Sequence, residues 1–204
     1  MDKLFNIVKF DKRYVFFSLV ITLTGILFGS LFIVIINKTD KVLVTEYINE
    51  FINNIKNNNF NYLNTLINTL IINNLIVIIM IIFGISCILV PLNILILFYK
   101  SFILGFSISS FILVYKLKGL ILSIIYIFPH LILNMLVFCV LTAYTLKLSL
   151  NLIKNIIKRK KANLSVYIQK YICVVIVFLI IISISSLYEA YIVPFIIKKI
   201  IVLL

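Results

Sequence analysis

The residue best suited to chemistry in this chain is its only histidine, His130, which directly follows Pro129. A proton relay or a metal site inside a membrane would need acidic partners beside this imidazole. None of the six Asp and Glu residues falls inside a long apolar run, and Glu189 follows the last of these runs. We therefore expect His130 to have a structural role, a hydrogen bond to a carbonyl group freed by the proline.

Other catalytic arrangements are not evident in the sequence. Hydrolysis needs an activated Ser or Cys beside a base, or several metal ligands. Three serines share the apolar region with the histidine, but no motif surrounds them: Ser107, Ser109 and Ser110. Three cysteines stand singly, without the spacing of zinc or redox sites: Cys87, Cys139 and Cys173. We predict no enzymatic activity, no cofactor and no metal.

The composition requires lipid as the surrounding solvent. Hydrophobic residues make up 64% of the 204 residues and charged residues only 12%, with a mean hydropathy of +1.25. Soluble chains are close to half apolar. The net charge of +13 comes from Lys and Arg in short gaps between apolar runs, a pattern typical of membrane topology rather than of nucleic-acid binding. Membrane lipid is therefore an expected partner, and nucleic acid is not.

The apolar runs predict an all-α polytopic protein, a single membrane domain over residues 1–204. Its five expected spans cover residues 14–36, 73–91, 96–115, 120–150 and 166–187. The fourth run is too long for one upright span, so we expect a helix broken or re-entrant near Pro129 and packed in the centre of the bundle. Pro91 predicts a tight inner turn, and Lys100 should reach the nearby membrane boundary with its ammonium group.

The one long polar stretch, residues 37–72, predicts two amphipathic helices with an Asn-rich turn between them. Its apolar residues recur at helical spacing and should share one face. That face could lie on lipid, pack on the same domain or bind a partner. The residues that we select as candidate partner contacts are Val44, Ile48, Phe51, Ile55, Phe60 and Leu63.

The basic residues predict the orientation. Twelve of the 19 fall on the expected inner side: Lys3, Lys9, Lys12, Arg13, Lys100, Lys147, Lys154, Lys158, Arg159, Lys160, Lys161 and Lys170. The positive-inside rule therefore predicts a cytoplasmic N-terminus and an extracytoplasmic C-terminus, with residues 37–72 outside. Gly25 and Gly29 form a GxxxG step that lets another helix approach closely. The second helix could belong to this chain, to a partner or to another copy in a homo-oligomer.

The order of these features resembles the stage II sporulation protein M family of endospore-forming bacteria, over nearly the whole chain. The resemblance is most specific between Phe83 and Phe106, and it also includes the Phe128-Pro129-His130 step and the segment from Glu189 to Pro194. The matching positions that we expect to shape helix packing are Gly25, Gly29, Gly84, Pro91, Lys100, Gly105, Pro129, His130, Glu189 and Pro194.

This resemblance implies a membrane component of the engulfment machinery at the sporulation septum. It implies a non-enzymatic scaffold that recruits peptidoglycan-degrading partners, stage II sporulation proteins D and P. The alternative is a transporter- or permease-like subunit, which would need a polar pathway that the expected spans do not show. Relatives in the wider superfamily carry His-Gly and a nearby Glu in the fourth span, where this chain has His130-Leu131 and no acid.

Overall fold

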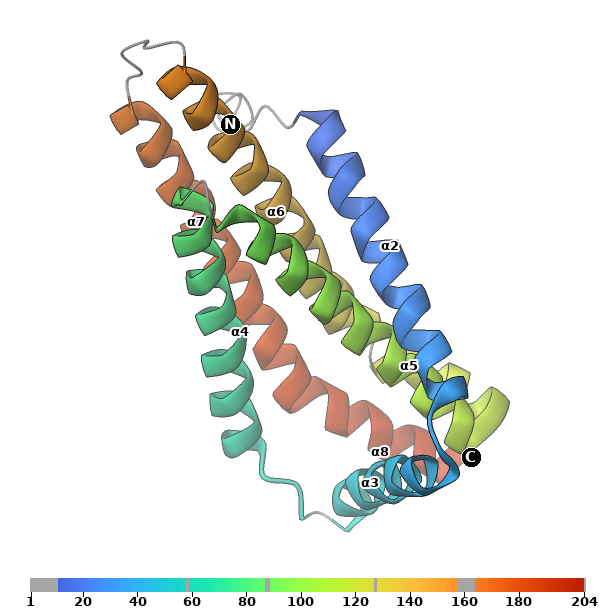
Figure 1. The fold of residues 1–204 in the computed structure, drawn as a ribbon. Helices are drawn as coiled ribbons and strands as arrows, with labels where there is room; N and C mark the ends of the chain where they lie inside the picture. The colour runs from blue at the N-terminus through green and yellow to red at the C-terminus, as the bar shows by residue number, and fades with distance from the viewer. Residues whose placement is uncertain (1–10, 58, 87–88, 127, 158–163, 204) are drawn as a thin grey trace.

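The computed structural model describes residues 11–57, 59–86, 89–126, 128–157 and 164–203, and no strand occurs among them. The elements are helices α2 (Lys12–Ile35), α3 (Lys38–Lys56), α4 (Tyr62–Ile85), α5 (Val90–Tyr126), α6 (Phe128–Ile157), α7 (Leu164–Leu187), the π-helix η1 (Tyr188–Ile192) and α8 (Val193–Leu203) (Figure 1). Most of the N-terminal basic segment and of the basic cluster around residues 158–161 lies outside the described residues.

Five segments are long and apolar enough to cross a membrane: Lys12–Ile35, Tyr62–Gly84, Val90–Ile124, Pro129–Ile153 and Val174–Lys199. The predicted all-α polytopic fold is therefore confirmed. Helices suit this solvent because they satisfy every backbone polar group internally. The spans run lengthwise side by side, and α2 begins at the end of the bundle opposite to α8 (Figure 1).

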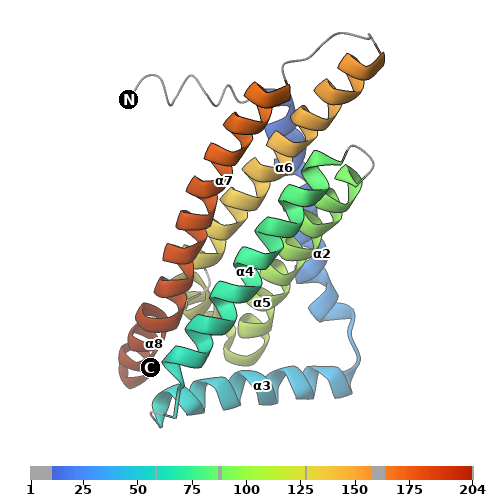
Figure 2. The same cartoon turned by 90° about the vertical axis from the view of Figure 1, so that its left-hand side faces the viewer.

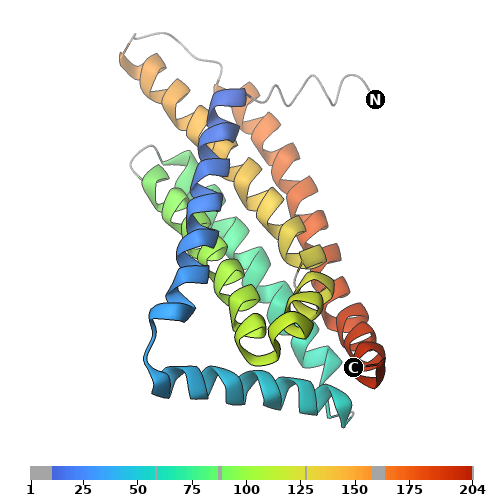
Figure 3. The same ribbon diagram turned by 90° about the vertical axis from the view of Figure 1, so that its right-hand side faces the viewer.

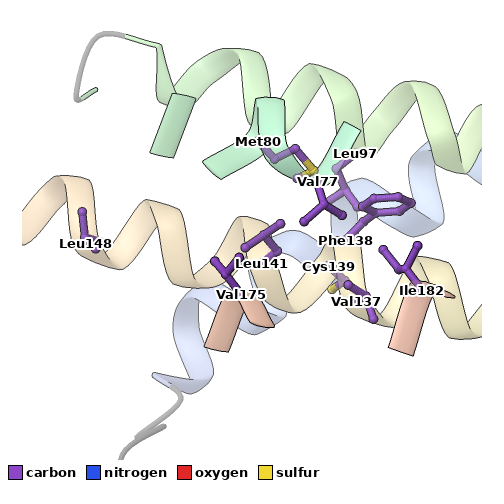
Figure 4. Packing of buried hydrophobic residues seen from close by; sticks show 10 residues of the cluster. All are labelled: Val77, Met80, Leu97, Val137, Phe138, Cys139, Leu141, Leu148, Val175 and Ile182. Carbon is purple, nitrogen blue, oxygen red and sulfur yellow. The ribbon is translucent and has the colours of Figure 1, made fainter. Parts of the chain in front are cut away.

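The centre of the bundle is built around α6. Half of its most apolar stretch is buried by other parts of the chain, as the sequence predicts for this run. Phe138 and Leu141 of α6 pack with Val77 of α4, Leu97 of α5 and Ile182 of α7 (Figure 4). Side chains from four helices thus meet in one dry cluster, which holds the spans together by close packing.

Small residues bring α2 and α5 into backbone contact. A Cβ atom at Gly25 would lie 2.6 Å from Cβ of Ser101, and one at Gly29 would overlap the Phe102 carbonyl group. From the other side, a Cβ atom at Gly105 would overlap the Ile26 carbonyl. The GxxxG step therefore packs within the chain, which decides between the alternatives that the sequence leaves open.

The turn between α4 and α5 lies before Pro91 rather than after it. Because α5 begins at Val90, Pro91 occupies its first turn, where a proline costs no hydrogen bond. Lys100 consequently lies about 15 Å along α5 from its start. The candidate span begins ten residues before Lys100, and the position of its ammonium group at a membrane boundary stays a prediction.

The chain reverses at Lys116, within the range assigned to α5. Its backbone angles, φ 52° and ψ −128°, are non-helical. A Cβ atom at Gly119 would overlap the Phe111 carbonyl, so residues after the reversal pack back on α5. A short helical piece therefore precedes α6, which starts at Phe128 and carries Pro129 in its first turn. Residue 127 lies outside the described residues, and a re-entrant path stays a prediction.

Helix α3 lies across the end of the bundle (Figures 2 and 3). Asn37 precedes it and Asn57 closes it, and Asp40 in its first turn and Lys56 in its last turn suit the helix dipole. Thr45 and other polar side chains separate its apolar residues, so it is far less hydrophobic than the five spans. The predicted amphipathic segment thus forms one crosswise helix, and its second apolar series begins α4.

Candidate functional site

Glu189 reaches His130 inside the bundle. Oε1 of the carboxylate lies 3.9 Å from Nε2 of the imidazole, and the side chains are 22% and 4% exposed, respectively. The expectation that no acid lies near the histidine is wrong. Its cause is the length of the last span, which runs through η1 into α8 rather than ending at residue 187. A carboxylate inside a span is tolerated when an opposite charge or a hydrogen-bond donor accompanies it.

Lys100 is the third ionisable group at this place. Its Nζ donates a hydrogen bond to Oδ1 of Asn73, 3.4 Å away, and lies 5.7 Å from the centroid of the Phe138 ring. The ammonium group also interacts electrostatically with Glu189. Helices α5, α6 and η1 therefore contribute Lys100, His130 and Glu189, which we name the ionic cluster.

The local backbone around Glu189 is unusual. Residues Tyr188–Ile192 form a π-helix, which adds a residue to the turn and often marks a functional place. Ala190 at its centre is fully buried. One turn earlier, the hydroxyl of Ser185 donates a hydrogen bond of 3.0 Å to the backbone carbonyl of His130. This bond ties the last span to the first turn of α6 beside the ionic cluster.

Further polar groups are buried between the spans. Nδ2 of Asn93 donates to the Met80 carbonyl at 2.9 Å and to Oγ1 of Thr145 at 3.3 Å. Asn134, one turn after His130 on α6, is 2% exposed, and its Oδ1 has no hydrogen-bond partner within the described part of the chain. The bundle interior is thus more polar than the sequence suggests, because these residues sit singly within apolar runs.

Two serines illustrate how hydroxyl groups are bonded in this part of the bundle. Oγ of Ser110 donates to the Phe106 carbonyl of its own helix at 2.7 Å. Ser185, which does approach His130, contacts its backbone rather than its imidazole. Within the described residues, no group of three or more His, Cys, Asp and Glu side chains could hold a metal ion.

The apolar face of α3 is docked on the bundle. Ile52 packs with Phe111 and Leu122 of α5, and Ile48 and Phe51 flank them. A hydrogen bond of 2.8 Å from the Tyr115 hydroxyl to Oδ1 of Asn49 accompanies this packing. The face selected for partner contact therefore meets the chain itself along this half of α3.

The carboxyl-terminal half of α3 packs on α8. Ile55, 3% exposed, lies against Val193 and Ile197, and Phe60 covers the same cluster. Val44 is half-buried, whereas Leu63 begins α4 and is 63% exposed. Of the predicted partner contacts, Ile48, Phe51, Ile55 and Phe60 thus stabilise the fold itself.

The opposite face of α3 is exposed, and its residues are not among the predicted partner contacts. Leu43 is 52% and Tyr47 is 72% exposed, and Glu46 and Glu50 are exposed beside them. These four residues are three or four positions apart and share one side of the helix. We name them the outer face of α3. Their mixed polarity gives a weak hydropathy signal, which explains why the stronger apolar stripe was selected instead.

The remaining packing positions are enclosed. Gly84 is buried at the end of α4, and Pro194 is buried in α8, directly after the π-helical turn η1. Both therefore contribute to packing between helices.

The chain was compared with known proteins. A family model described as Stage II sporulation protein M matches residues 18–194, a range that includes the ionic cluster and α3. No curated protein and no solved structure matches the chain. The family match and the five candidate spans together define its class. The chain belongs to the stage II sporulation protein M family and is a sporulation-related, multi-pass membrane protein.

Proposed function

We propose that this protein is a non-enzymatic membrane scaffold of the engulfment machinery that recruits peptidoglycan-degrading proteins to the sporulation septum. The observation that supports this most directly is the outer face of α3, in which the apolar side chains of Leu43 and Tyr47 stand exposed beside two carboxylates. The inner face of the same helix is packed on the bundle. A helix held from one side presents its other side in a defined orientation, which lowers the entropic cost of binding.

The chemistry of the outer face suits a protein partner. Three of the chain's acidic residues, Asp40, Glu46 and Glu50, lie on α3, in a chain whose net charge is +13. Carboxylates are repelled by anionic lipid, so a basic or neutral protein surface is the better complement. Tyr is also enriched at the centres of protein interfaces. By family resemblance, the partners are stage II sporulation proteins D and P, and they carry out the hydrolysis.

A pull-down from sporulating cells tests this proposal. The double substitution Leu43→Ser and Tyr47→Ser should reduce the recovery of these two partners with the full-length protein at least about tenfold, because interface aromatic residues often contribute 2 kcal/mol or more, roughly, to binding. Leu117→Ser is the matched control, since Leu117 is 81% exposed and follows Tyr115, which contacts α3, by two residues, but lies outside α3. Undiminished recovery with the double variant would contradict the role of this face.

The orientation has its own test. We propose a cytoplasmic N-terminus and an extracytoplasmic α3, as the distribution of basic residues predicts. In a background where the three cysteines are replaced, Tyr47→Cys should react with a membrane-impermeant maleimide added outside intact cells. Reaction only after the membrane is permeabilised would place α3 in the cytoplasm and exclude contact with the cell wall.

A second function is favoured by one observation, the ionic cluster. Ionisable residues that meet inside a membrane often mark an ion or proton pathway. A transporter- or permease-like subunit should catalyse flux in proteoliposomes, and Glu189→Gln should abolish that flux. Absence of flux for the native protein, together with intact partner recovery, would leave the scaffold as the function.

A further inference from the structure

Helices α2, α5 and α6 enclose an apolar groove within the candidate spans. Its volume is about 320 Å³, whereas a closed cavity of about 150 Å³ already binds benzene. The hydroxyl of Thr22, in its wall, is engaged by the Ser18 carbonyl at 2.9 Å, so the wall is apolar in character. The lining includes Leu19, Thr22 and Ile26 of α2, Ile108 of α5, and Leu136 and Cys139 of α6.

We propose that this groove, which we name the lipid groove, binds one acyl chain of an anionic phospholipid whose phosphate group lies at Lys12 and Arg13. The inference assigns a ligand to the membrane domain. It does not depend on what α3 binds, so it can fail or succeed separately from the scaffold function.

The first step is the nature of the occupant. The lipid groove is open at its rim, where Leu19 is 43% and Leu136 is 53% exposed. The solvent at this depth is lipid, and an unfilled groove would lose dispersion contacts along its wall. A helix is about 10–12 Å across and is too wide to enter a groove of this volume. An extended hydrocarbon chain is narrow enough.

The second step is the charge on α2. Lys12 precedes Leu19 by seven residues, and Leu19 precedes Ile26 by seven, so the three lie on one side of the helix. Lys12 and Arg13 are both exposed. The carboxylate of Asp11, directly before them, offsets one of the two charges. A net positive group thus stands in line with the lipid groove and is complementary to a phosphate.

Helix α6 adds a third cation on the same side. Lys147 follows Leu136 by eleven residues, which is about three helical turns, so the two share one side of α6. The helix ends at the end of the bundle where α2 begins (Figure 3). The positive residues of both helices therefore lie toward the same membrane boundary, beyond the same end of the lipid groove.

The third step is depth. Along the axis of α2, Leu19 is about 10 Å and Ile26 about 21 Å from Lys12. The headgroup layer is roughly 5–7 Å thick and half of the hydrocarbon core about 15 Å, so a phosphate at Lys12 places its chains about 5–22 Å away. The part of the lipid groove formed by α2 consequently matches the chain region of one leaflet.

Tryptophan fluorescence in bilayers tests the site, because the chain contains no Trp. In the full-length protein, Leu136→Trp reports from the rim of the lipid groove. Leu133→Trp is the matched control, since Leu133 is on the same helix and 42% exposed but lies outside the groove. Each variant is reconstituted in phosphatidylcholine vesicles with a small fraction of phosphatidylglycerol, and one lipid at a time carries brominated chains, which quench Trp on contact.

Brominated phosphatidylglycerol should quench Leu136→Trp as if it were enriched about tenfold or more over its bulk fraction, because each Lys or Arg near an anionic headgroup contributes a factor of about five. Brominated phosphatidylcholine should show no enrichment at this position. At Leu133→Trp, both lipids should quench according to their bulk fractions.

The headgroup part is tested by removing charge. Lys12→Gln with Arg13→Gln should bring the quenching of Leu136→Trp down to that expected from the bulk fraction. Lys38→Gln with Lys116→Gln is the matched control and should leave the enrichment unchanged, since it removes two exposed cations near α3 instead. Elution as a single species and an unchanged helical circular dichroism spectrum show that a variant is folded.

Three results would overturn the assignment. The first is equal quenching efficiency of the two brominated lipids at Leu136→Trp, which would exclude selection of the headgroup. The second is the same enrichment at Leu133→Trp, which would show a general attraction of anionic lipid to a basic protein. The third is an enrichment that survives the loss of Lys12 and Arg13, or that falls equally in the Lys38 and Lys116 control.

Discussion

The two sides of α5 hold the bundle together by opposite means. Toward α2, Gly105 and the Gly25–Gly29 step allow backbone to touch backbone. Toward the bundle interior, Lys100 enters the ionic cluster with His130 and Glu189. The first contact depends on the absence of side chains and the second on compensation between charged ones. Replacing one of these glycines disrupts the helix contact directly, whereas the effect of replacing a charged residue depends on its partner.

This difference has an energetic consequence. Close packing in a membrane relies on dispersion contacts and interhelical hydrogen bonds, since lipid removes the hydrophobic drive between helices. It is lost when any larger side chain is introduced. A charge pair can instead be replaced by neutral groups with little loss, provided that both members change together. The two sides should therefore respond differently to single substitutions.

The largest effect is expected where α2 and α5 are in backbone contact. Gly29→Leu should lower the free energy of unfolding by at least about 3 kcal/mol, because the new side chain would overlap the Phe102 backbone, which cannot move aside cheaply. Titration with a denaturing detergent, followed by circular dichroism, measures this loss. Leu23→Ala on the same helix is the control, since Leu23 is 61% exposed. A loss of unfolding free energy no greater than that of the control would contradict the close contact between α2 and α5.

A smaller effect is expected at His130. His130→Ala should destabilise the bundle by about 2 kcal/mol, because it removes a buried side chain and leaves a cavity beside Glu189. The same detergent titration applies. If the protein also proved to be a hydrolase and lost that activity with His130→Ala, the non-enzymatic proposal would be wrong.

The hydrogen bond from Ser185 to the His130 carbonyl should contribute less. Ser185→Ala is expected to cost about 0.6 kcal/mol, the average for interhelical hydrogen bonds within membranes. Ser186→Ala is a matched control, because its hydroxyl donates within its own helix to the Ile182 carbonyl. Equal losses of unfolding free energy for the two variants would show that the interhelical hydrogen bond contributes no more than the bond within one helix.

The smallest effect is expected at Lys116, and its sign is reversed. The backbone angles of Lys116 match the first central position of a type II′ turn, which glycine prefers. Lys116→Gly should therefore stabilise the protein by about 0.5 kcal/mol, the relief of strain exceeding the added chain entropy. The contacts of α5 with α2 and with the bundle interior should stay unchanged. A destabilised variant would show that the lysine side chain outweighs the strain.

The spans were predictable because each is a local property of the chain. An apolar run of sufficient length is helical in lipid whatever its neighbours are, so the five segments were visible before the structure. The ends of the spans were less predictable than their existence. The last candidate span continues beyond residue 187, because Glu189 faces His130 inside the bundle, whereas hydropathy counts this acid as solvated.

The α3 segment shows the same limit. Its amphipathic spacing was correctly read, but an apolar stripe is equally suited to a partner and to the chain's own bundle. Only the positions of Phe111, Val193 and Ile197 show that the stripe is already covered. The exposed residues Leu43 and Tyr47 then become the better candidates for partner contact.

The sequence by itself determined that the chain is a helical, multi-pass membrane protein of the stage II sporulation protein M family, because run length, composition and motif order are all read along one chain. The tertiary structure alone decided which residues meet. It joined Lys100, His130 and Glu189 from three helices and placed α3 against α8. Contacts between distant helices depend on their rotation and crossing, and spacing within a single helix does not specify either.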